Sequence, residues 1–548
     1  MAVLCVLALF LTLDHTRGDS ATIDEPPHIY AGMEYLTRGV LRTNPEHPPL
    51  SKLLAALSLV RAPGLTLPDV SGAPRLRPAD LYPFFLANAI PLPEMLALAR
   101  APFRWLLAAL IVGVYLAARA ASGTPAALLA SAMMALDPNL IAHAGVVHSD
   151  VAAALLMTLT VVLTLSAVGG PSWRWMLAGL TLGLAIATKF TALILVPLVV
   201  LAPLLLLLER ESRPKWIESI VSALAACMVA ALVVYAVYAA SMRAMAPNEA
   251  ASVSSTFLRH RGADPETVAR YARLTQRAPE VGMFLSGVKG VQLLSAGERD
   301  WNFLNGRLSR KGFPQYFFVA FLLKSTPAML LLTAAIAAGG RHLRNKWGIG
   351  MLVVVATLFV VSIPSAFNIG VRHILPIYPL LAIVGASALA ARLPRRAFAV
   401  AAAALLVSAA VSLASIHPFE LGYFNVFGGP RNLNDSNVDW GQDVDRMHSF
   451  LRQKGWERDT RVVVFAMPRL HGVERYPPLD LSISPGHYAT SSYMEYVGPT
   501  TLRSRQGAAA GDVLQRLMDA LHTRGRRVAR VGSSITIWDL PAAPPTSR

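Results

Sequence analysis

Long apolar stretches dominate this sequence and restrict what it can fold into. About 20 apolar residues in a row suffice to cross a bilayer as a helix. Only 15% of the residues are charged, whereas soluble proteins contain about 25%. We therefore expect an all-α polytopic membrane domain with about eleven transmembrane helices. The apolar segments lie near residues 2–13, 102–121, 124–142, 150–168, 173–188, 190–208, 216–240, 315–337, 347–364, 374–391 and 397–416.

Basic residues gather in short loops beside these segments. The net charge of +17 could indicate a nucleic-acid partner. Charges in short loops follow the positive-inside rule instead, so we expect no nucleic acid. With the N-terminus in the cytoplasm, the outer loops are 14–100 and 241–313, and every compact basic loop is cytoplasmic. These basic loops contain Arg119, Arg174, Arg210, Arg213, Lys215, Arg341, Arg344, Lys346, Arg392, Arg395 and Arg396.

The N-terminal run 2–13 has two interpretations. It resembles the core of a signal peptide, but it lacks a basic start and a clean small-x-small cleavage site. We therefore expect a shortened first transmembrane helix.

The C-terminal region differs in kind from the rest of the chain. Amphipathic helix patterns and apolar β-rich runs occur there together, which is typical of a small α/β domain outside the membrane. We predict a transmembrane domain at 1–416 and an external domain at 417–548, on the non-cytoplasmic side. The helical patterns lie near 443–455 and 511–523, and the β-rich runs at 461–466 and 527–538.

The apolar run 175–208 is too long for one straight span. Its 34 residues would extend about 51 Å as a helix, whereas the hydrocarbon core is about 30 Å thick. Lys189 would then lie near the middle, at a cost of roughly 3 kcal/mol. We expect two short spans that turn at Thr188-Lys189 on the outer side.

The first outer loop carries the most informative motifs. Residues 24–52 read DEPPHIYAGMEYLTRGVLRTNPEHPPLSK. Asp24 and Glu25 lie immediately outside the first span, where a carboxylate can act as a general base toward an acceptor hydroxyl. Glu46 and His47 precede two prolines that hold a turn rigid. A second interpretation of Asp24 stays open, because Asp beside Pro often only begins a turn.

These motifs resemble a known enzyme family. The patterns DE-x(2)-H-x(3)-G-x-x-Y and N-x-E-H-P-P-L-x-K are similar to the first outer loop of the protein O-mannosyltransferase and aminoarabinose transferase superfamily. Its members are GT-C class glycosyltransferases that use polyprenyl-phosphate sugars. The resemblance implies a bacterial member in which Asp24 is the essential acidic residue. It also implies that His47, where several relatives have Lys, lies near the donor phosphate.

Two further ionisable residues lie at outer turns. Asp150, in His148-Ser149-Asp150, opens the fourth span, and the resemblance implies an acidic residue there that faces the active-site cavity. A cap of the helix N-terminus is the alternative. Lys189, in ATKFTA, matches a pattern of the family and is a candidate for binding the donor phosphate. Snorkelling of the lysine to the interface is the alternative.

A third turn contains Arg372 and His373, at the outer end of the tenth span. It resembles the R-H-x-L-P-x-x-P turn of the family. Arginine offers fixed donors for the negative charge that develops on a phosphate leaving group, so we predict a phosphate clamp, with helix-end packing as the alternative. Lys324 lies about 12 Å deep in the span that follows Tyr316, by helical rise, and has no assigned task.

The segment GYFNVFGGPRNLNDSNVDWGQDVDRM, from Gly422 to Met447, resembles one found in many bacterial members. Its acidic and amide side chains suggest a calcium loop, but position six is Trp440 rather than Gly, and position twelve is Arg446 rather than Glu. Helix capping at 439–443 is the favoured explanation, and a role at the acceptor mouth stays unassigned.

These features predict an inverting, hexosyl- or mannosyltransferase-like enzyme of the bacterial inner membrane, with its active site on the non-cytoplasmic face. The donor is a polyprenyl-phosphate sugar, and the acceptor is a protein, lipid or glycan. A transporter or flippase of lipid-linked sugars and an inactive scaffold are the alternatives; transporters often show inverted repeats, and none is evident. The predicted site residues are Asp24, Glu25 and Asp150 for catalysis, and His47, Lys189, Arg372 and His373 for the donor phosphate.

No cofactor is expected besides the lipid-linked donor. Cationic side chains that neutralise a phosphate reduce the need for a divalent metal, so we expect no strict metal requirement and assign no metal ligand. Cys5 and Cys227 each lie inside an apolar stretch, where neither a disulfide nor a metal site is expected.

Overall fold

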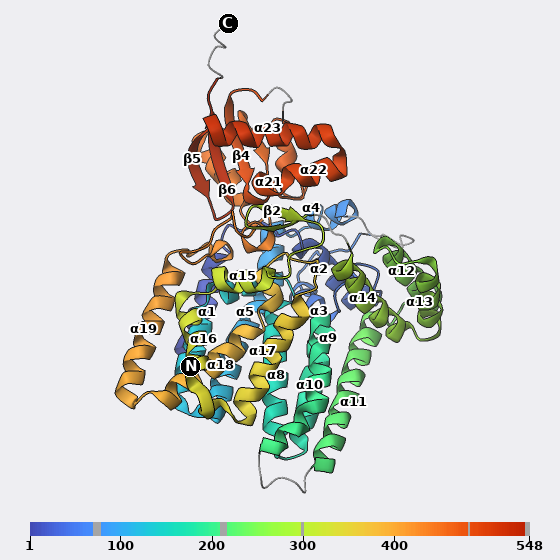
Figure 1. Cartoon of the computed structure of the whole chain (residues 1–548). Coiled ribbons are helices and arrows are strands. Elements are labelled where there is room, and N and C mark those ends of the chain that lie inside the picture. Colours follow the sequence, from blue (N-terminus) through green and yellow to red (C-terminus); the bar gives the residue numbers. More distant parts are fainter. Residues whose placement is uncertain (69–77, 209–215, 298–300, 480–482, 543–548) are drawn as a thin grey trace.

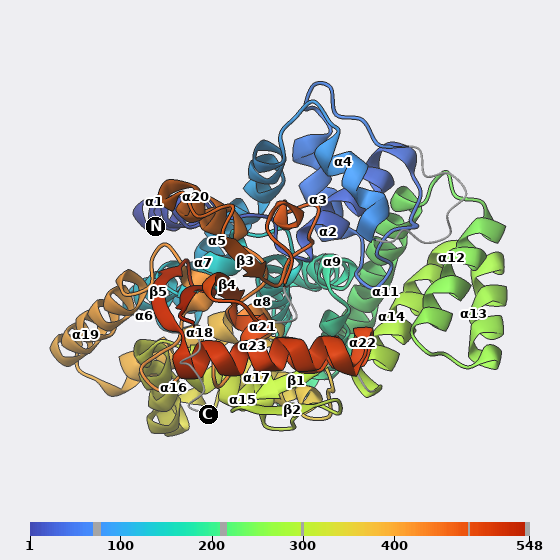
Figure 2. The same cartoon turned by 90° about the horizontal axis from the view of Figure 1, so that it is seen from above.

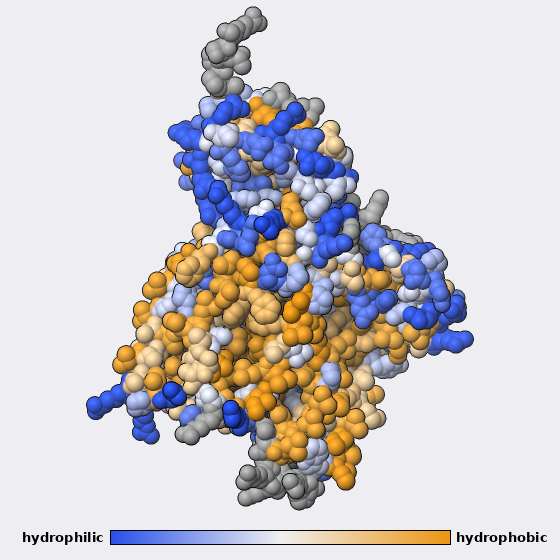
Figure 3. Space-filling model, viewed as in Figure 1, coloured by the Kyte–Doolittle hydropathy of each residue, from blue (hydrophilic) through white to orange (hydrophobic). Residues whose placement is uncertain are grey.

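The computed structural model describes residues 1–68, 78–208, 216–297, 301–479 and 483–542. A body of roughly parallel and antiparallel helices carries a C-terminal domain at one end (Figure 1). On the face shown in Figure 3, apolar residues predominate on the helical body, whereas hydrophilic residues predominate on the C-terminal domain. This division supports the prediction of an integral membrane protein.

Five helical runs among the described residues are long and apolar enough to cross a membrane. On α11, Leu224, Met228 and Leu232 are exposed, as expected of side chains that face lipid. The five runs are α5 (Leu92–Ser122), α8 (Asp150–Ala167), Phe190–Leu207, α11 (Trp216–Ser241) and α19 (Arg395–Ala414). The third run, Phe190–Leu207, is made up of η3 (Phe190–Ile194), α10 (Leu195–Leu201) and most of η4 (Ala202–Leu208).

Two further apolar segments are bent pairs of helices. The pair α6 (Thr124–Ala135) and α7 (Pro138–Ala144) is bent by 58°, and the pair α15 (Tyr316–Lys324) and α16 (Pro327–Gly339) by 117°. Shorter helices complete the body, and α1 packs against α5. They are α1 (Ala2–His15), α9 (Trp173–Thr188), η6 (Gly340–Leu343), α17 (Lys346–Ser362), η7 (Val371–Ile374) and α18 (Ile377–Arg392).

All eleven predicted apolar segments are therefore helical, but the number of spans stays a prediction, because several helices are short and two segments are bent. The predicted turn at Lys189 is present: α9 ends at Thr188, and Lys189 itself is extended, with φ −151° and ψ 127°. The 117° bend contradicts one expectation. Lys324 ends α15 rather than lying deep in a straight span.

The predicted basic residues stand at the helix ends away from the C-terminal domain. Arg119 lies in the last turn of α5, Arg392 ends α18, and Arg395 begins α19. Asp150 begins α8 and Lys189 follows α9, so both stand at the opposite ends of their helices. Outside the described residues lie Arg210, Arg213, Lys215 and the side chain of Arg341.

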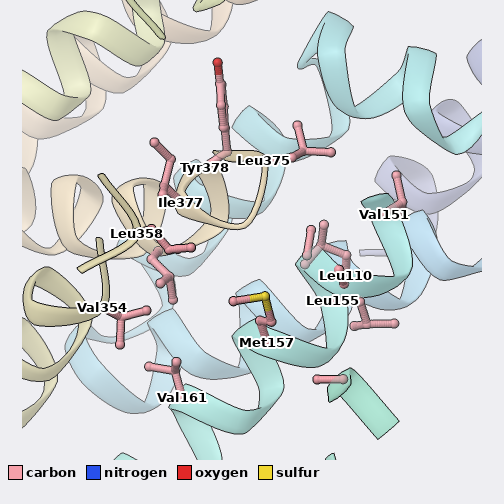
Figure 4. Packing of buried hydrophobic residues seen from close by; sticks show 14 of the residues in the cluster. Leu110, Val151, Leu155, Met157, Val161, Val354, Leu358, Leu375, Ile377 and Tyr378 are labelled. Carbon is pink, nitrogen blue, oxygen red and sulfur yellow. The ribbon is translucent and has the colours of Figure 1, made fainter. Parts of the chain in front are cut away.

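One hydrophobic core joins the helices. Leu110 of α5, Val151 and Leu155 of α8, Leu358 of α17 and Tyr378 of α18 converge in it (Figure 4). All five side chains are almost fully buried. Since these residues come from helices far apart in sequence, the core fixes how the helix ends are placed around the outer surface.

The outer segments form two groups of short elements on the same side as the C-terminal domain. Viewed from above, α12 and α13 lie on the flank opposite α19 (Figure 2). The first group is α2 (Glu25–Met33), η1 (Glu34–Arg38), α3 (Leu50–Leu59), η2 (Pro78–Leu81) and α4 (Tyr82–Leu86). The second group is α12 (Pro247–His260), α13 (Pro265–Arg277), α14 (Pro279–Ala296), β1 (Asn302–Leu304) and β2 (Arg307–Ser309).

The C-terminal domain contains a four-stranded sheet in the order β3-β4-β6-β5, in which only the β3–β4 pair is parallel. Helix α23 lies over this sheet (Figure 1). The strands are β3 (Thr460–Val463), β4 (Gly486–Ser491), β5 (Arg526–Val531) and β6 (Ile535–Leu540). The helices are η8 (Glu420–Gly422), η9 (Asp435–Asn437), α20 (Val444–Lys454), η10 (Val473–Arg475), α21 (Ser492–Tyr496), α22 (Gly498–Gln506) and α23 (Ala508–Arg524).

Candidate active site

Asp150 lies at the centre of a buried charged cluster. Its Oδ1 is 2.6 Å from Lys189 Nζ, and its Oδ2 is 2.9 Å from His148 Nδ1 and 3.7 Å from Arg372 Nη1. Asp150 lies in the first turn of α8, so its charge also faces the helix N-terminus and the capping alternative stays open beside these contacts. Lys189 is only 7% exposed and is paired, which contradicts snorkelling. Burial in low dielectric strengthens such pairs, and each charge here has an opposite partner.

Arg372 joins this cluster to Asp24. Its Nη2 is 3.3 Å from Asp24 Oδ2, and its Nη1 donates to His148 Nε2 at 2.9 Å. Residues from the C-terminal segment complete its surroundings. Its Nε donates to Ser436 Oγ at 3.0 Å, and its guanidinium carbon lies 4.3 Å from the centre of the Trp440 ring. The buried Arg372 therefore spans four separate chain segments.

Asp24 differs from the other acids because its carboxylate is 35% exposed. It stands at the N-terminus of α2 without making a side-chain cap, so the turn-starting interpretation does not account for it. The carboxylate lines a cavity of about 220 Å³, which His28, Arg42, His47 and Arg261 also line. A general base needs an accessible face within hydrogen-bond reach of its proton donor, and the exposed face of Asp24 on this cavity is compatible with that requirement.

Glu25 lies outside this cluster. Its carboxylate accepts hydrogen bonds from Arg100 at 2.7 Å and from the backbone nitrogens of Thr22 and Val147. Burial alone would raise the pKa of Glu25, but the Arg100 charge and these hydrogen bonds lower it below its usual value. Because Val147 precedes His148, Glu25 holds the turn that carries the cluster, and its fully buried carboxylate has no free face toward the cavity.

His47 is brought to the site, at the wall of the Asp24 cavity. Burial, together with the charges of His148 and Lys52, lowers the pKa of His47 well below its usual value. An uncharged imidazole can donate a hydrogen bond to a phosphate but adds no positive charge. His47 therefore supplies a hydrogen-bonding group rather than a charge at this position.

His373 lies near the charged cluster, and its ring faces aromatic side chains. Its ring packs edge-on against Phe317 and Phe367. Burial lowers the pKa of His373 well below its usual value, with Lys189 and Arg372 adding to the shift. The residue next to Arg372 is thus an uncharged aromatic partner in this packing.

Three histidines lie close enough to be considered as a metal site. The ligand atoms of His28, His47 and His148 are within 4.8 Å of one another. Tetrahedral zinc with Zn–N bonds of about 2.0–2.1 Å would bring these atoms to about 3.4 Å. Both ring nitrogens of His148 already face other groups, Arg372 and Asp150. A metal would have to displace Arg372 and enter beside a cation, so the expectation of no strict metal requirement stays a prediction.

The segment at 435–443 binds the site to the C-terminal domain, which the sequence interpretation missed. Asp443 does not cap α20; its Oδ2 accepts from the backbone nitrogens of Ser533 and Ser534, both at 2.9 Å. Asp439 Oδ2 accepts from Tyr493 N at 2.8 Å. The capping explanation is therefore wrong. The only sequence signal for this role was the unusual density of polar residues in the motif.

Lys324 is also explained by this segment. At the bend between α15 and α16, its Nζ donates to the carbonyl oxygens of Leu421 and Asn437 at 2.8 and 2.6 Å. Asn437 in turn accepts from Val371 N at 3.0 Å and donates to Tyr316 at 2.9 Å. Lys324 therefore fastens the 435–443 segment against the helices.

An apolar cavity of about 350 Å³ lies between α9, α10, α11 and α14. Ile186, Leu193, Val234 and Phe284 line it. Phe284 packs against Phe190, the residue that follows Lys189, with ring centres 5.7 Å apart. One contact between aromatic rings thus connects the cavity wall to the residue that follows Lys189.

Comparison with known proteins agrees with this geometry. A model of the dolichyl-phosphate-mannose-protein mannosyltransferase family matches residues 96–239, which include Asp150 and Lys189. The crystal structure of ArnT from Cupriavidus metallidurans bound to undecaprenyl phosphate aligns over 99% of this chain and 98% of ArnT, with a TM-score of 0.51 and 14% identity. The predicted superfamily resemblance is confirmed.

The same GT-C fold recurs in a second structure. The oligosaccharyltransferase of Archaeoglobus fulgidus in its apo form aligns over 94% of this chain and 72% of its own length, with a TM-score of 0.51 and 12% identity. No curated protein sequence matches the chain. At these identities the structural likeness establishes the GT-C fold, and the chemistry has to be argued from the residues of this chain.

Proposed function

We propose that this protein is an inverting glycosyltransferase that moves a sugar from a polyprenyl-phosphate donor to a protein, lipid or glycan acceptor on the outer face of the bacterial inner membrane. One observation carries the proposal. A half-exposed carboxylate, Asp24, borders a polar cavity, and directly behind it lie the buried cations Arg372 and Lys189 with Asp150.

Asp24 is the general base of the proposed reaction. It removes the proton from the acceptor hydroxyl or amine while that atom attacks the anomeric carbon. The bond between the anomeric carbon and the phosphate oxygen breaks in the same in-line displacement. The configuration inverts, the polyprenyl phosphate leaves with the bonding electrons, and the proton remains on Asp24 until water removes it.

Arg372 and Lys189 stabilise the leaving phosphate. Electrostatic stabilisation of developing charge is usually the largest single contribution to catalysis. Asp150 is the acid that holds both cations, since it lies 2.6 Å from Lys189 Nζ and 3.7 Å from Arg372 Nη1. His47 contributes a hydrogen bond rather than a charge, and no metal is required for this arrangement.

The donor class is supported by the apolar cavity whose wall contacts Phe190, the residue that follows Lys189. A polyprenyl tail needs an apolar path that reaches the phosphate site, and the cavity between α9, α10, α11 and α14 has the required lining. Tyr235, which also lines it, is exposed on α11, so the cavity reaches the surface that we assign to lipid.

The proposed sidedness rests on the opposite ends of the helices. The basic ends of α5, α18 and α19 would face the cytoplasm by the positive-inside rule. Asp24, Asp150 and the region 417–548 would then stand outside. Labelling of single cysteines introduced at exposed positions of each end, in intact cells, tests this assignment.

The function is tested by comparing lipid-linked sugars and surface glycoconjugates by mass spectrometry in cells with the wild-type protein, with Asp24→Asn and without the gene. We expect the donor to accumulate and one product to disappear both without the gene and in the variant. An unchanged product in Asp24→Asn cells overturns the proposal. A transporter would instead tolerate the substitution, because moving a lipid-linked sugar needs no base.

A further inference from the structure

We infer that Ser436 and Trp440, in the segment 435–443, are positioning residues that fix the plane of the Arg372 guanidinium, so that the C-terminal segment forms part of the donor-phosphate site. The inference rests on the proposed function of Arg372 as a phosphate ligand. It assigns a task to a motif that the reaction scheme above does not use.

Arg372 has two kinds of contact. The Asp24, Asp150 and His148 contacts lie at its terminal nitrogens, the atoms that would meet a phosphate. The Ser436 and Trp440 contacts lie at Nε and over the guanidinium face. These two positions leave the terminal nitrogens free to exchange partners. Together they fix both the rotation and the tilt of the planar group.

Ser436 itself has a fixed orientation. Its hydroxyl donates to Ile369 O at 2.7 Å, which leaves a lone pair of Oγ for Arg372 Nε. Gly370 lies so close that an added Cβ would fall 2.5 Å from Ser436 Oγ. The close approach of the two segments therefore depends on the absence of a side chain at this glycine.

Trp440 is equally constrained. Its ring packs against the rings of His143 and His148, with centres 6.0 and 5.5 Å away. Three residues before it in the chain, Asn437 accepts a hydrogen bond from Val371 N and donates one to Tyr316. Its position is thus set by the helices that surround the site, and it presents its face to Arg372 because an aromatic face attracts a cation.

The segment is also fastened to the C-terminal domain. Asp439 accepts from Tyr493 N at 2.8 Å, and Asn434 Nδ2 donates to Ser492 O at 3.1 Å. A change in the C-terminal domain at this point can therefore reach Arg372 through two neighbouring residues. This gives the domain a direct connection to the donor site.

The test is a double-mutant cycle on binding and on transfer. Wild-type protein, Trp440→Leu, Arg372→Ala and the double variant are purified, and the dissociation constant for radiolabelled undecaprenyl phosphate is measured with each. We expect Trp440→Leu to weaken binding and to lower kcat/KM by roughly tenfold. In the Arg372→Ala background, it should have almost no further effect, because its influence passes through Arg372.

Two conservative variants separate positioning from folding. Trp440→Phe keeps an aromatic face and should recover most of the binding. Ser436→Ala removes the Nε acceptor and should weaken binding by about threefold. Trp456→Leu is the matched control, since Trp456 stacks on His487 within the C-terminal domain at 4.0 Å and does not touch Arg372. We expect it to bind undecaprenyl phosphate as the wild type does.

The outcomes distinguish this inference from the proposed function. The inference is overturned if Trp440→Leu and Trp456→Leu bind undecaprenyl phosphate equally well. It is also overturned if Trp440→Leu weakens binding as much in the Arg372→Ala background as in the wild type. Both outcomes count even when sugar transfer is intact. A non-additive cycle in a protein that binds the lipid phosphate but transfers no sugar supports the inference and overturns the transferase assignment. Absence of any binding by the wild type overturns both. If Trp440→Leu does not fold, the same double-mutant cycle is measured with Ser436→Ala in its place. Ser436→Ala should then weaken binding in the wild type and have almost no further effect in the Arg372→Ala background.

Discussion

Two charged networks lie at the helix ends nearest the C-terminal domain, and the adjacent residues Asp24 and Glu25 belong to different networks. The open network consists of Asp24, Asp150, Lys189 and Arg372. The closed network consists of Asp19, Glu25, Arg100 and Arg446. In the closed network, Arg100 binds Glu25 at 2.7 Å and Arg446 binds Asp19 at 2.8 Å, and both carboxylates are at most 5% exposed. In the open network, Asp24 is 35% exposed on a cavity.

The difference shows how to assign roles to buried charges. A buried pair whose partners are all within the protein contributes to structure, and removing one partner leaves an uncompensated charge. A carboxylate with a free face on a cavity can instead exchange partners with a substrate. By this criterion, the neighbours Asp24 and Glu25 have different tasks, although both were expected to be catalytic.

The largest effect should come from Asp24→Asn. Loss of a positioned general base typically lowers the rate by about 10²–10⁴-fold. We expect the purified variant to lose transfer by that factor while its thermal unfolding stays close to that of the wild type. The matched control is Glu94→Gln, an exposed carboxylate at the outer start of α5. If Asp24→Asn keeps full activity, the functional distinction between the two networks is wrong.

Glu25→Gln should act on stability instead. It leaves Arg100 buried without a charged partner, which typically costs about 3–5 kcal/mol. The measurement is the unfolding free energy in denaturant, or the unfolding temperature in detergent, together with activity per folded molecule. Normal stability with a selective loss of activity would move Glu25 into the open network.

A smaller effect is expected from neutralising the pair at the centre of the open network. Asp150→Asn and Lys189→Met should each lower kcat/KM. The first leaves Lys189 buried without its carboxylate partner, and the second leaves Asp150 with only His148 and Arg372. The double variant should be less impaired than the product of the two effects, with a coupling of about 1–3 kcal/mol. Strict additivity would indicate that the 2.6 Å contact has no energetic role.

The smallest effect concerns the attachment of the C-terminal domain. Burial raises the pKa of Asp439 to about 7, whereas the pKa of an aspartate in an unfolded chain is about 3.9. The Asp439 carboxyl group therefore binds its proton more tightly in the folded protein than in the unfolded chain. The stability gained from this difference is complete below about pH 4 and is lost as the pH rises through about 7. Unfolding temperatures measured from pH 5 to 8 should fall with pH in the wild type and less steeply in Asp439→Asn. Equal slopes would contradict this expectation.

The sequence predicts some parts of this molecule well and others poorly, for physical reasons. Apolar length predicts helices, and a charge inside an apolar run predicts the break at Lys189, because both are local properties. The 117° bend after Lys324 was missed, since the carbonyl groups that hold Lys324 belong to residues about a hundred positions later.

The candidate site shows the same limit. Motif resemblance indicated Asp24, Asp150, Lys189 and Arg372, and the structure brings these four together. It did not indicate that Arg372 rests on Trp440. Nor did it show that Asp443 binds a turn 90 residues away, because capping rules describe only neighbours in sequence. The buried pairing of Glu25 was missed for a related reason: its partner Arg100 is 75 residues away.

The contact between α2 and α3 has a consequence for redesign. A methyl group added at Gly32 would fall 2.0 Å from the carbonyl oxygen of Lys52. The Lys52 side chain, in turn, donates to the carbonyl oxygens of Asn44 and His47. The proline-rich turn is therefore tethered to the helix that begins beside Asp24. Replacing the turn alone would break the Lys52 hydrogen bonds, so a redesigned turn has to be exchanged together with α2 and α3.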